Sequence, residues 1–181
     1  TAPEEFNNWS DELVEIEAKI KAQAKPDTGI KVQVGVSNAL IKAVKKGHPV
    51  ISISSDLPGS TGLAAFRKEY PQFSMDVGIA ESNMVSTAIG LSKLGFIPVV
   101  DTFAQFGVTK GALPLTMASL SQAPMIAIFS HTGFQDAADG ASHQALSYLA
   151  MSSSIPGVET YCLSCSDEAD YLISQAVQEF M

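Results

Sequence analysis

The sequence predicts an α/β domain in the form of a three-layer parallel-sheet sandwich, with helices on both faces of the sheet. Segments that are apolar along their whole length, such as VISIS at 50–54 and MIAIFS at 125–130, alternate with segments of helical periodicity. Strands buried on both faces have this continuous apolar character, whereas half-exposed strands alternate apolar and polar residues. The chain of 181 residues is 46% hydrophobic, which is enough for one sizeable core.

The amino-terminal part is predicted to be helical. Residues 10–25 carry apolar side chains on one face and end before Pro26, as an amphipathic helix does. We therefore divide the chain into a helical lead-in at 1–27 and the domain itself at 28–181. A second helix is expected at 37–46, where a glycine follows as a stop signal.

The rest of the chain alternates predicted strands with predicted helices. Strands are expected at 50–54, 73–77, 97–103, 125–130 and 158–163. Helices are expected at 84–94, 107–120, 144–151 and 167–180. The helix at 107–120 must accommodate Pro114, which has no backbone N–H to donate. Because such a pattern normally leads from a helix into another strand, we expect the domain to lack its last strand, which a longer chain or a partner would supply.

Composition excludes several classes of partner. The net charge is −8 and no run of Lys or Arg occurs, so neither nucleic acid nor an anionic membrane surface is expected as the main partner. No apolar segment approaches the length of a membrane span and the acidic amino terminus lacks a signal-peptide core, which favours a cytoplasmic location. Cys162 and Cys165 form a CxxC without a second pair and without a helix start directly after it, so we expect reduced structural thiols.

A ligand site is predicted at one edge of the sheet. In open parallel sheets, ligands bind outside the carboxyl ends of the strands. Distinctive polar and aromatic residues end or follow four successive predicted strands: Asp56 and Ser60, Glu81, Phe103 and Phe106, and His131. The glycine motifs of dinucleotide and ATP domains, GxGxxG and GxxxxGK[ST], are absent from the corresponding positions, so those folds are disfavoured.

Each of these residues, taken alone, has two interpretations. Glu81 is expected in the first turn of its helix or just before it, where the helix dipole favours a carboxylate whether or not it is catalytic. Phe103 and Phe106 are either ordinary core residues or a flat apolar platform for a heteroaromatic ring beside a carboxylate. The stretch DLPGSTG at 56–62 is either a simple turn or a phosphate site built from backbone N–H groups and Ser60.

The loop after the fourth strand contains residues of metal-binding type. His131, Asp136, Asp139 and His143 would suit zinc or manganese, but their spacing matches no standard ligand motif. Hydrogen-bonded histidines at strand and helix ends explain the pattern equally well. We predict no metal ligand within this chain.

Three linked motifs identify a family resemblance. They are DVGIAESNM at 76–84, GFIPVVDTFAQF at 95–106 and HTGFQDAADGASHQ at 131–144. Their order and spacing closely resemble the pyrimidine-binding, or central, domain of transketolases, which are thiamine-diphosphate-dependent enzymes. The resemblance runs from Val50 to the end of the chain and implies the thiamine-diphosphate-binding fold in its pyrimidine module.

The resemblance implies a role for each cofactor-pocket residue. Glu81 corresponds to the glutamate that hydrogen-bonds N1′ of the aminopyrimidine and promotes proton transfer. Phe106, with Phe103 beside it, corresponds to the surface on which the pyrimidine stacks. Asp56 and Leu57 correspond to further residues of the cofactor pocket.

It also implies the substrate side of the site. His131, Asp139 and His143 correspond to groups that meet the sugar hydroxyls and assist proton movements, so His143 joins Glu81 as a catalytic residue. Ser60 corresponds to a residue that helps to hold the sugar phosphate. The stretch Gln33–Ser37 lacks the arginine that often binds this phosphate in the family, which leaves phosphorylated-sugar specificity open.

The implied function is transfer of a two-carbon ketol unit between sugars through thiamine diphosphate and Mg²⁺ or Ca²⁺. In the family, a separate domain with a GDG motif holds the diphosphate and the metal, and no glycine of this sequence is followed by aspartate. We therefore expect a homodimer, or a complex with a diphosphate-binding domain or subunit, and an inactive isolated chain. The alternatives are a deoxyxylulose-phosphate synthase, an oxo-acid dehydrogenase component, or a non-catalytic binding module of the same fold.

Overall fold

The computed structural model describes residues 29–134 and 138–180. The predicted helix at 10–25, the division of the chain at residue 27 and the candidate ligand Asp136 therefore lie outside the described residues. Within the described ranges, no helix is long and apolar enough to cross a membrane.

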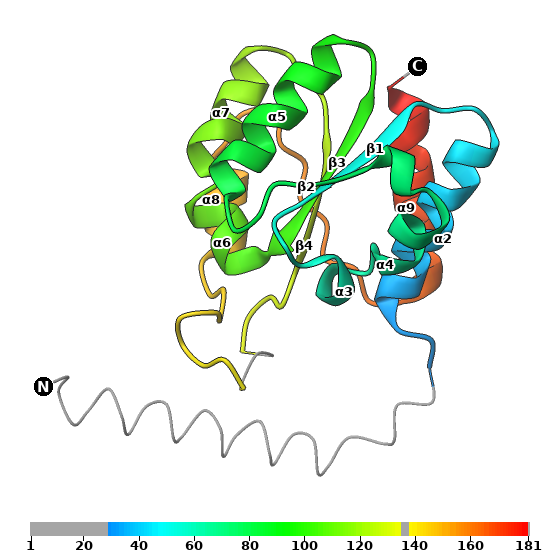
Figure 1. Ribbon diagram of the computed structural model, residues 1–181. Coiled ribbons are helices and arrows are strands. Elements are labelled where there is room, and N and C mark those ends of the chain that lie inside the picture. The colour runs from blue at the N-terminus through cyan, green and yellow to red at the C-terminus, as the bar shows by residue number, and fades with distance from the viewer. Residues whose placement is uncertain (1–28, 135–137, 181) are drawn as a thin grey trace, which may run out of the picture.

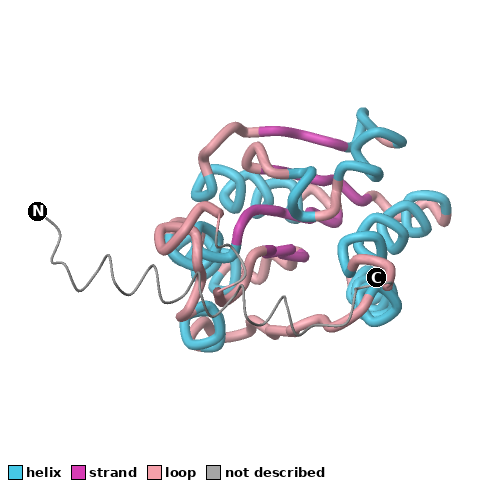
Figure 2. Tube along the Cα trace, turned by 90° about the horizontal axis from the view of Figure 1, so that it is seen from below, coloured by secondary structure: helices cyan, strands magenta, loops and turns pink. Residues whose placement is uncertain are grey.

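The described strands form a four-stranded, fully parallel sheet in the order β2-β1-β3-β4. The strands are β1 (Val50–Ser54), β2 (Ser74–Asp76), β3 (Ile97–Phe103) and β4 (Ile126–Ser130). Figure 2 shows them side by side, in magenta. Ser54 pairs with Asp76 on one side and Asp101 on the other, and Phe103 pairs with Ser130. The carboxyl ends of all four strands therefore lie at one edge of the sheet.

Helices cover both faces of this sheet, as predicted (Figure 1). One layer contains α2 (Val32–Lys45), α4 (Ala64–Glu69) and α9 (Ser166–Glu179). The other contains α5 (Glu81–Lys93), α6 (Ala104–Thr109), α7 (Ala112–Leu120) and α8 (Tyr148–Ser153). The short helix α3 (Pro58–Thr61) lies at the carboxyl edge of the sheet, where it contacts β3 and β4 (Figure 1). A short 3-10 helix, η1 (Pro71–Phe73), leads into β2. Two hydrophobic clusters, one on each face, make up the core. The predicted three-layer α/β class is confirmed.

The helix predicted at 107–120 is two helices, α6 and α7. The break falls at Lys110 and Gly111, not at Pro114. Pro114 is the third residue of α7, where the backbone N–H that proline lacks has no intrahelical acceptor in any case. The proline therefore fits the first turn of a new helix, and the single-helix prediction was wrong.

The strand predicted at 158–163 is also wrong, because this segment runs as irregular chain. Tyr161 is 61% exposed and donates a hydrogen bond to Glu159, and Cys162 is exposed as well. The segment is therefore not buried on both sides, as a strand inside this sheet would be. Both cysteines are free thiols. Cys165 directly precedes α9 as its cap residue, contrary to the expectation that no helix start follows the CxxC.

The closest approach between α2 and α9 depends on Gly35. A Cβ atom at this position would lie 2.0 Å from the backbone oxygen of Ser166, well inside van der Waals contact. The two helices can pack at this distance only because residue 35 has no side chain.

Replacing Gly35 with alanine should therefore destabilise the domain, although alanine favours helix by about 1 kcal/mol relative to glycine. We expect a net loss of about 1–3 kcal/mol in the free energy of unfolding, because backbone must shift to remove the clash. Urea unfolding followed by circular dichroism measures it. The matched control is Gly90→Ala in α5, where a Cβ meets nothing within 4 Å and the change should stabilise. Equal effects of the two changes would contradict the packing argument.

Candidate functional site

Two residues at the carboxyl edge of the sheet have unusual backbone conformations. Asp56, just after β1, has φ 62°, and His131, directly after β4, has φ 57°. Non-glycine residues adopt this left-handed region at an energetic cost, and such residues cluster at functional sites. Both are residues that the sequence placed in the candidate site.

Glu81 lies at the start of α5 and is almost completely buried, with 2% of its surface exposed. The chain reaches it from β2 through a turn in which Gly78 has φ 70° and donates a hydrogen bond to Asp76 Oδ1 at 2.9 Å. The predicted position in the first helical turn is confirmed. Buried carboxylates normally have a charged or hydrogen-bonding partner, and Lys110 Nζ lies 3.9 Å from Glu81 Oε2.

An aromatic and imidazole cluster lies at the ends of β3 and β4. Phe103 and Phe106 are stacked, with centroids 6.3 Å apart and ring planes at 17°. The His131 ring lies 4.1 Å from Phe103, and the His143 ring approaches Phe106 edge-on at 5.0 Å. Residues far apart in the sequence thus form one cluster of rings, in which the phenylalanines stack and His143 stands edge-on to Phe106.

Lys110 connects this aromatic cluster to Glu81. Its ammonium group lies 5.3 Å from the centroid of Phe106 as well as 3.9 Å from the Glu81 carboxylate. Sequence analysis missed Lys110. Its position four residues after Phe106, on the same face of a predicted helix, was the available signal.

The remaining predicted residues follow β1 or β4 in the chain. Leu57 directly precedes α3 and Ser60 belongs to it, both half-buried, and α3 packs against the ends of β3 and β4. Asp139 is exposed in the loop that follows β4. Two serines hold the histidine rings: Ser130 Oγ is 2.9 Å from His131 Nδ1, and Ser142 Oγ is 2.9 Å from His143 Nδ1. In the described ranges no three His, Cys, Asp or Glu side chains lie close enough to hold a metal ion.

Asp101, near the end of β3, is a second buried carboxyl group that sequence analysis missed. It is 0% exposed, and Ser54 Oγ and Thr61 Oγ1 lie 2.8 and 2.6 Å from its Oδ2. Burial raises the pKa of Asp101 from its ordinary 3.8 to about 6, against opposing effects of the hydrogen bonds to Thr61 and Ser54 and of the Arg67 charge. A charged residue inside the apolar run VVDTF was the signal in the sequence.

This raised pKa predicts a pH dependence of stability. Between about pH 4 and pH 6 the unfolded chain has lost the Asp101 proton and the folded chain retains it, so stability falls as pH rises. The expected loss is at most about 3 kcal/mol by pH 7, from about 1.4 kcal/mol per unit of pKa difference. We would measure the free energy of unfolding in urea at a series of pH values. In Asp101→Asn it should not show this fall with rising pH, and it should exceed that of wild type at neutral pH. Parallel pH profiles for the two proteins would contradict it.

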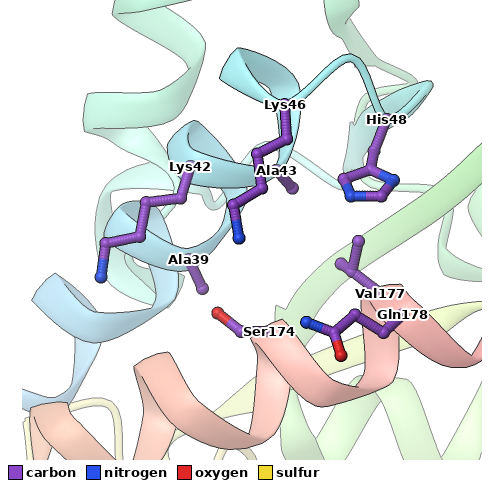
Figure 3. A pocket seen from close by; sticks show the side chains of 8 residues that line it. All are labelled: Ala39, Lys42, Ala43, Lys46, His48, Ser174, Val177 and Gln178. Atoms are coloured by element: carbon purple, nitrogen blue, oxygen red, sulfur yellow. The ribbon is translucent and has the colours of Figure 1, made fainter.

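A small cavity between α2 and α9 lies away from this site (Figure 3). It is lined by Ala39, Lys42, Ala43, Lys46, His48, Ser174, Val177 and Gln178. His48 precedes β1, so the cavity is near the amino end of that strand rather than its carboxyl end. Its volume is about 20 Å³, room for roughly one water molecule, which excludes it as a metabolite site.

The fold and this geometry define a class of protein: an α/β ligand-binding domain whose site combines a buried helix-start carboxylate, stacked phenylalanines and histidines at the carboxyl ends of parallel strands. Residues 28–180 match the family model of the transketolase pyrimidine binding domain. The chain belongs to this family.

Known relatives contain this domain as one part. 1-Deoxy-D-xylulose-5-phosphate synthase from Mycolicibacterium gilvum is 32% identical over 140 residues, covering 74% of this chain and 22% of the relative. The synthase from Clostridium acetobutylicum is 27% identical over 141 residues, covering 78% and 23%. The chain thus spans about a fifth of the length of these relatives.

Solved structures give the same fold. A split gene transketolase, described as an inactive beta4 tetramer, superposes with a TM-score of 0.67 at 25% identity and covers 83% of this chain and 48% of that one. Transketolase from Leishmania mexicana gives a TM-score of 0.73 at 20% identity and covers 86% and 25%.

Proposed function

We propose that this domain forms the pyrimidine-binding half of a thiamine diphosphate site in a transketolase-type enzyme. The observation that carries the proposal is the arrangement of Glu81, Lys110 and Phe106: the Lys110 ammonium group lies 3.9 Å from a buried carboxylate at a helix start and 5.3 Å from the centroid of an aromatic ring. Membership of the family supports it.

The residues present fit the aminopyrimidine ring. A buried carboxyl group such as that of Glu81 can accept or share a proton with a ring nitrogen, and Phe106 offers a face for stacking. Lys110 now contacts both partners, and its side chain is 57% exposed, so it can swing outward when a ring takes its place. Thiamine diphosphate, when bound, supplies the nucleophilic carbon that attacks a ketose carbonyl.

The histidines are proposed to act on the substrate. His131 and His143 border the aromatic surface and each has a serine hydroxyl at its Nδ1, which leaves Nε2 available for a sugar hydroxyl or a proton transfer. Asp139 and Ser60 are proposed to contact the sugar and its phosphate, and Asp56 and Leu57 to line the cofactor pocket. We propose His143 and Glu81 as the catalytic residues.

The complete enzyme is proposed to move a two-carbon ketol unit between sugars in the cytoplasm. Mg²⁺ or Ca²⁺ and the diphosphate would be held by another domain or subunit, in a homodimer or a hetero-complex. The named relatives favour a second candidate, a deoxyxylulose-phosphate synthase. Assay of the complete enzyme with an aldose acceptor, or with pyruvate and glyceraldehyde phosphate, separates the two. An oxo-acid dehydrogenase component would need a lipoyl acceptor, and a non-catalytic module would give no turnover.

Glu81→Gln in the complete enzyme should lower kcat by at least about a hundredfold, because the amide cannot take up a proton. Steady-state kinetics at saturating thiamine diphosphate measures it. The control is Glu69→Gln, which removes a surface ion pair with Lys45 and should leave kcat unchanged. Near-normal turnover of Glu81→Gln would reject the assignment.

Lys110→Met should increase the affinity of the complete enzyme for thiamine diphosphate by about two- to fivefold. The cofactor ring would no longer have to displace the exposed Lys110 ammonium group from the buried Glu81 carboxylate, at 3.9 Å, an interaction that we put at up to about 1 kcal/mol. Fluorescence titration or calorimetry gives the Kd. Lys93→Met is the matched control, because Lys93 is the last residue of α5, far from Glu81, and donates to the Gln122 carbonyl. A higher Kd for Lys110→Met than for wild type would show instead that the lysine helps to bind the cofactor.

A further inference from the structure

Four residues beneath the proposed cofactor loop form a closed ring of hydrogen-bonding groups that starts and ends on the backbone of Leu57. The Leu57 N–H donates to Ser54 Oγ at 3.2 Å, and Ser54 Oγ donates to Asp101 Oδ2 at 2.8 Å. On the other side, Thr61 Oγ1 lies 2.6 Å from the same Oδ2 and 3.0 Å from the carbonyl oxygen of Leu57. The ring therefore links β1, β3 and α3 through one carboxyl oxygen.

The number of protons in this ring depends on the state of Asp101. Thr61 has one hydroxyl proton but lies between two acceptors, the carboxyl oxygen of Asp101 and the carbonyl of Leu57. If Asp101 is ionised, the Thr61 hydroxyl can donate to only one of them, although the Leu57 carbonyl also accepts from the backbone N–H groups of Ser60 and Thr61 at 3.1 and 3.2 Å. If Asp101 Oδ2 carries a proton, it donates to Thr61 Oγ1 and Thr61 donates to Leu57. Every contact of the ring then has one donor and one acceptor.

We propose that Asp101 is a positioning residue whose carboxyl proton closes this ring and holds the loop from Asp56 to Ser60 in its binding conformation. That this loop faces a cofactor rests on the proposed function, whereas the ring itself does not. The loop needs such support because Asp56 adopts a strained left-handed conformation.

The surroundings of Asp101 favour the protonated form. Its side chain is fully buried, and its other oxygen, Oδ1, has no hydrogen-bond partner among the described residues. An unpartnered oxygen costs less in a neutral carboxyl group than in a carboxylate. Burial raises the pKa of Asp101 to about 6, so the ring is expected to open as pH rises from 5 to 7.

Two charged side chains act on Asp101 from neighbouring elements. Arg67 of α4 favours ionisation, but its guanidinium also donates to the Met75 carbonyl at 2.8 Å and to Asp76 Oδ2 at 3.4 Å. Asp76 of β2 opposes ionisation. Of the other elements that contact β3, β1, β4, α3 and α6 contain no charged residue. The charged residues of α5, Glu81 and Lys93, belong to the helix on the opposite face of the sheet from Asp101. The protonation of Asp101 thus depends first on burial, which the hydroxyl groups of Thr61 and Ser54 and one partly neutralised arginine oppose.

The test is a pH titration of the 181-residue chain by ¹H–¹⁵N NMR, with hydrogen exchange of the Leu57 amide as a second readout. We expect the Leu57 amide resonance of wild type to titrate with a midpoint near pH 6. Exchange of this amide, corrected for its intrinsic pH dependence, should quicken by about tenfold above the midpoint, equivalent to about 1.4 kcal/mol. In Asp101→Asn the side chain no longer titrates, so the transition should be absent.

Thr61→Val and Thr61→Ser are a matched pair of variants for the same measurement. Comparing them tests the proposal even if Asp101→Asn does not fold. Valine keeps the shape of threonine but breaks the ring, so the Leu57 amide should exchange rapidly at every pH. Serine keeps the hydroxyl and should keep the transition. A Leu57 amide that does not respond to pH in wild type, or one that titrates unchanged in Thr61→Val, would overturn the proposal.

Cofactor binding separates this inference from the proposed function. In the complete enzyme, the Kd for thiamine diphosphate should weaken above about pH 6 in wild type and remain pH-independent over this range in Asp101→Asn. If the enzyme does not bind thiamine diphosphate at any pH but the Leu57 amide still titrates, the proposed function is rejected and the role of Asp101 in the ring stands. If the enzyme binds thiamine diphosphate but the Leu57 amide does not titrate, the role of Asp101 in the ring is rejected and the proposed function stands.

Discussion

The parallel pairing of β3 with β1 on one side and β4 on the other is the constraint on which the rest of the structure depends. Its register puts Ser54 beside Asp101 and Phe103 beside Ser130, so that the loops following three strands emerge at one edge. Parallel strands need long connections, and here the connections are helices that cover both faces of the sheet. The rings of Phe103 and His131 can meet only because of this arrangement.

Two buried carboxyl groups at this edge have different environments and therefore different chemistry. Glu81 lies at a helix start with an ammonium group 3.9 Å away, whereas Asp101 lies inside the sheet and contacts hydroxyl groups. The cation near Glu81 compensates a negative charge, while the hydroxyls around Asp101 can donate to the carboxyl group or accept from it. Such differences allow one site to contain a group that interacts with a ligand and another that organises the pocket.

Predictions succeeded where local sequence and tertiary packing agree. The strand at Ile97–Phe103 was predicted to the residue, because every position in it is buried and the pattern is continuous. The strand predicted at 158–163 failed, since the segment contains the polar pair Glu159 and Thr160 and stays largely exposed. The helix predicted at 107–120 failed for another reason: helical periodicity continues across α6 and α7, and only their packing places the break at Gly111, whose missing side chain leaves room for the Gly107 carbonyl.

The sequence by itself determined the α/β class, the carboxylate at the start of α5, the phenylalanine pair and the family, because these depend on residues close together in the chain or on motifs in a fixed order. Only the tertiary structure decided how Lys110 meets Glu81 and which hydroxyls surround Asp101. The bonds from Asp101 to Ser54 and Thr61 span 47 and 40 residues of chain. No local pattern encodes such pairs, since strand register and the docking of α3 bring them together.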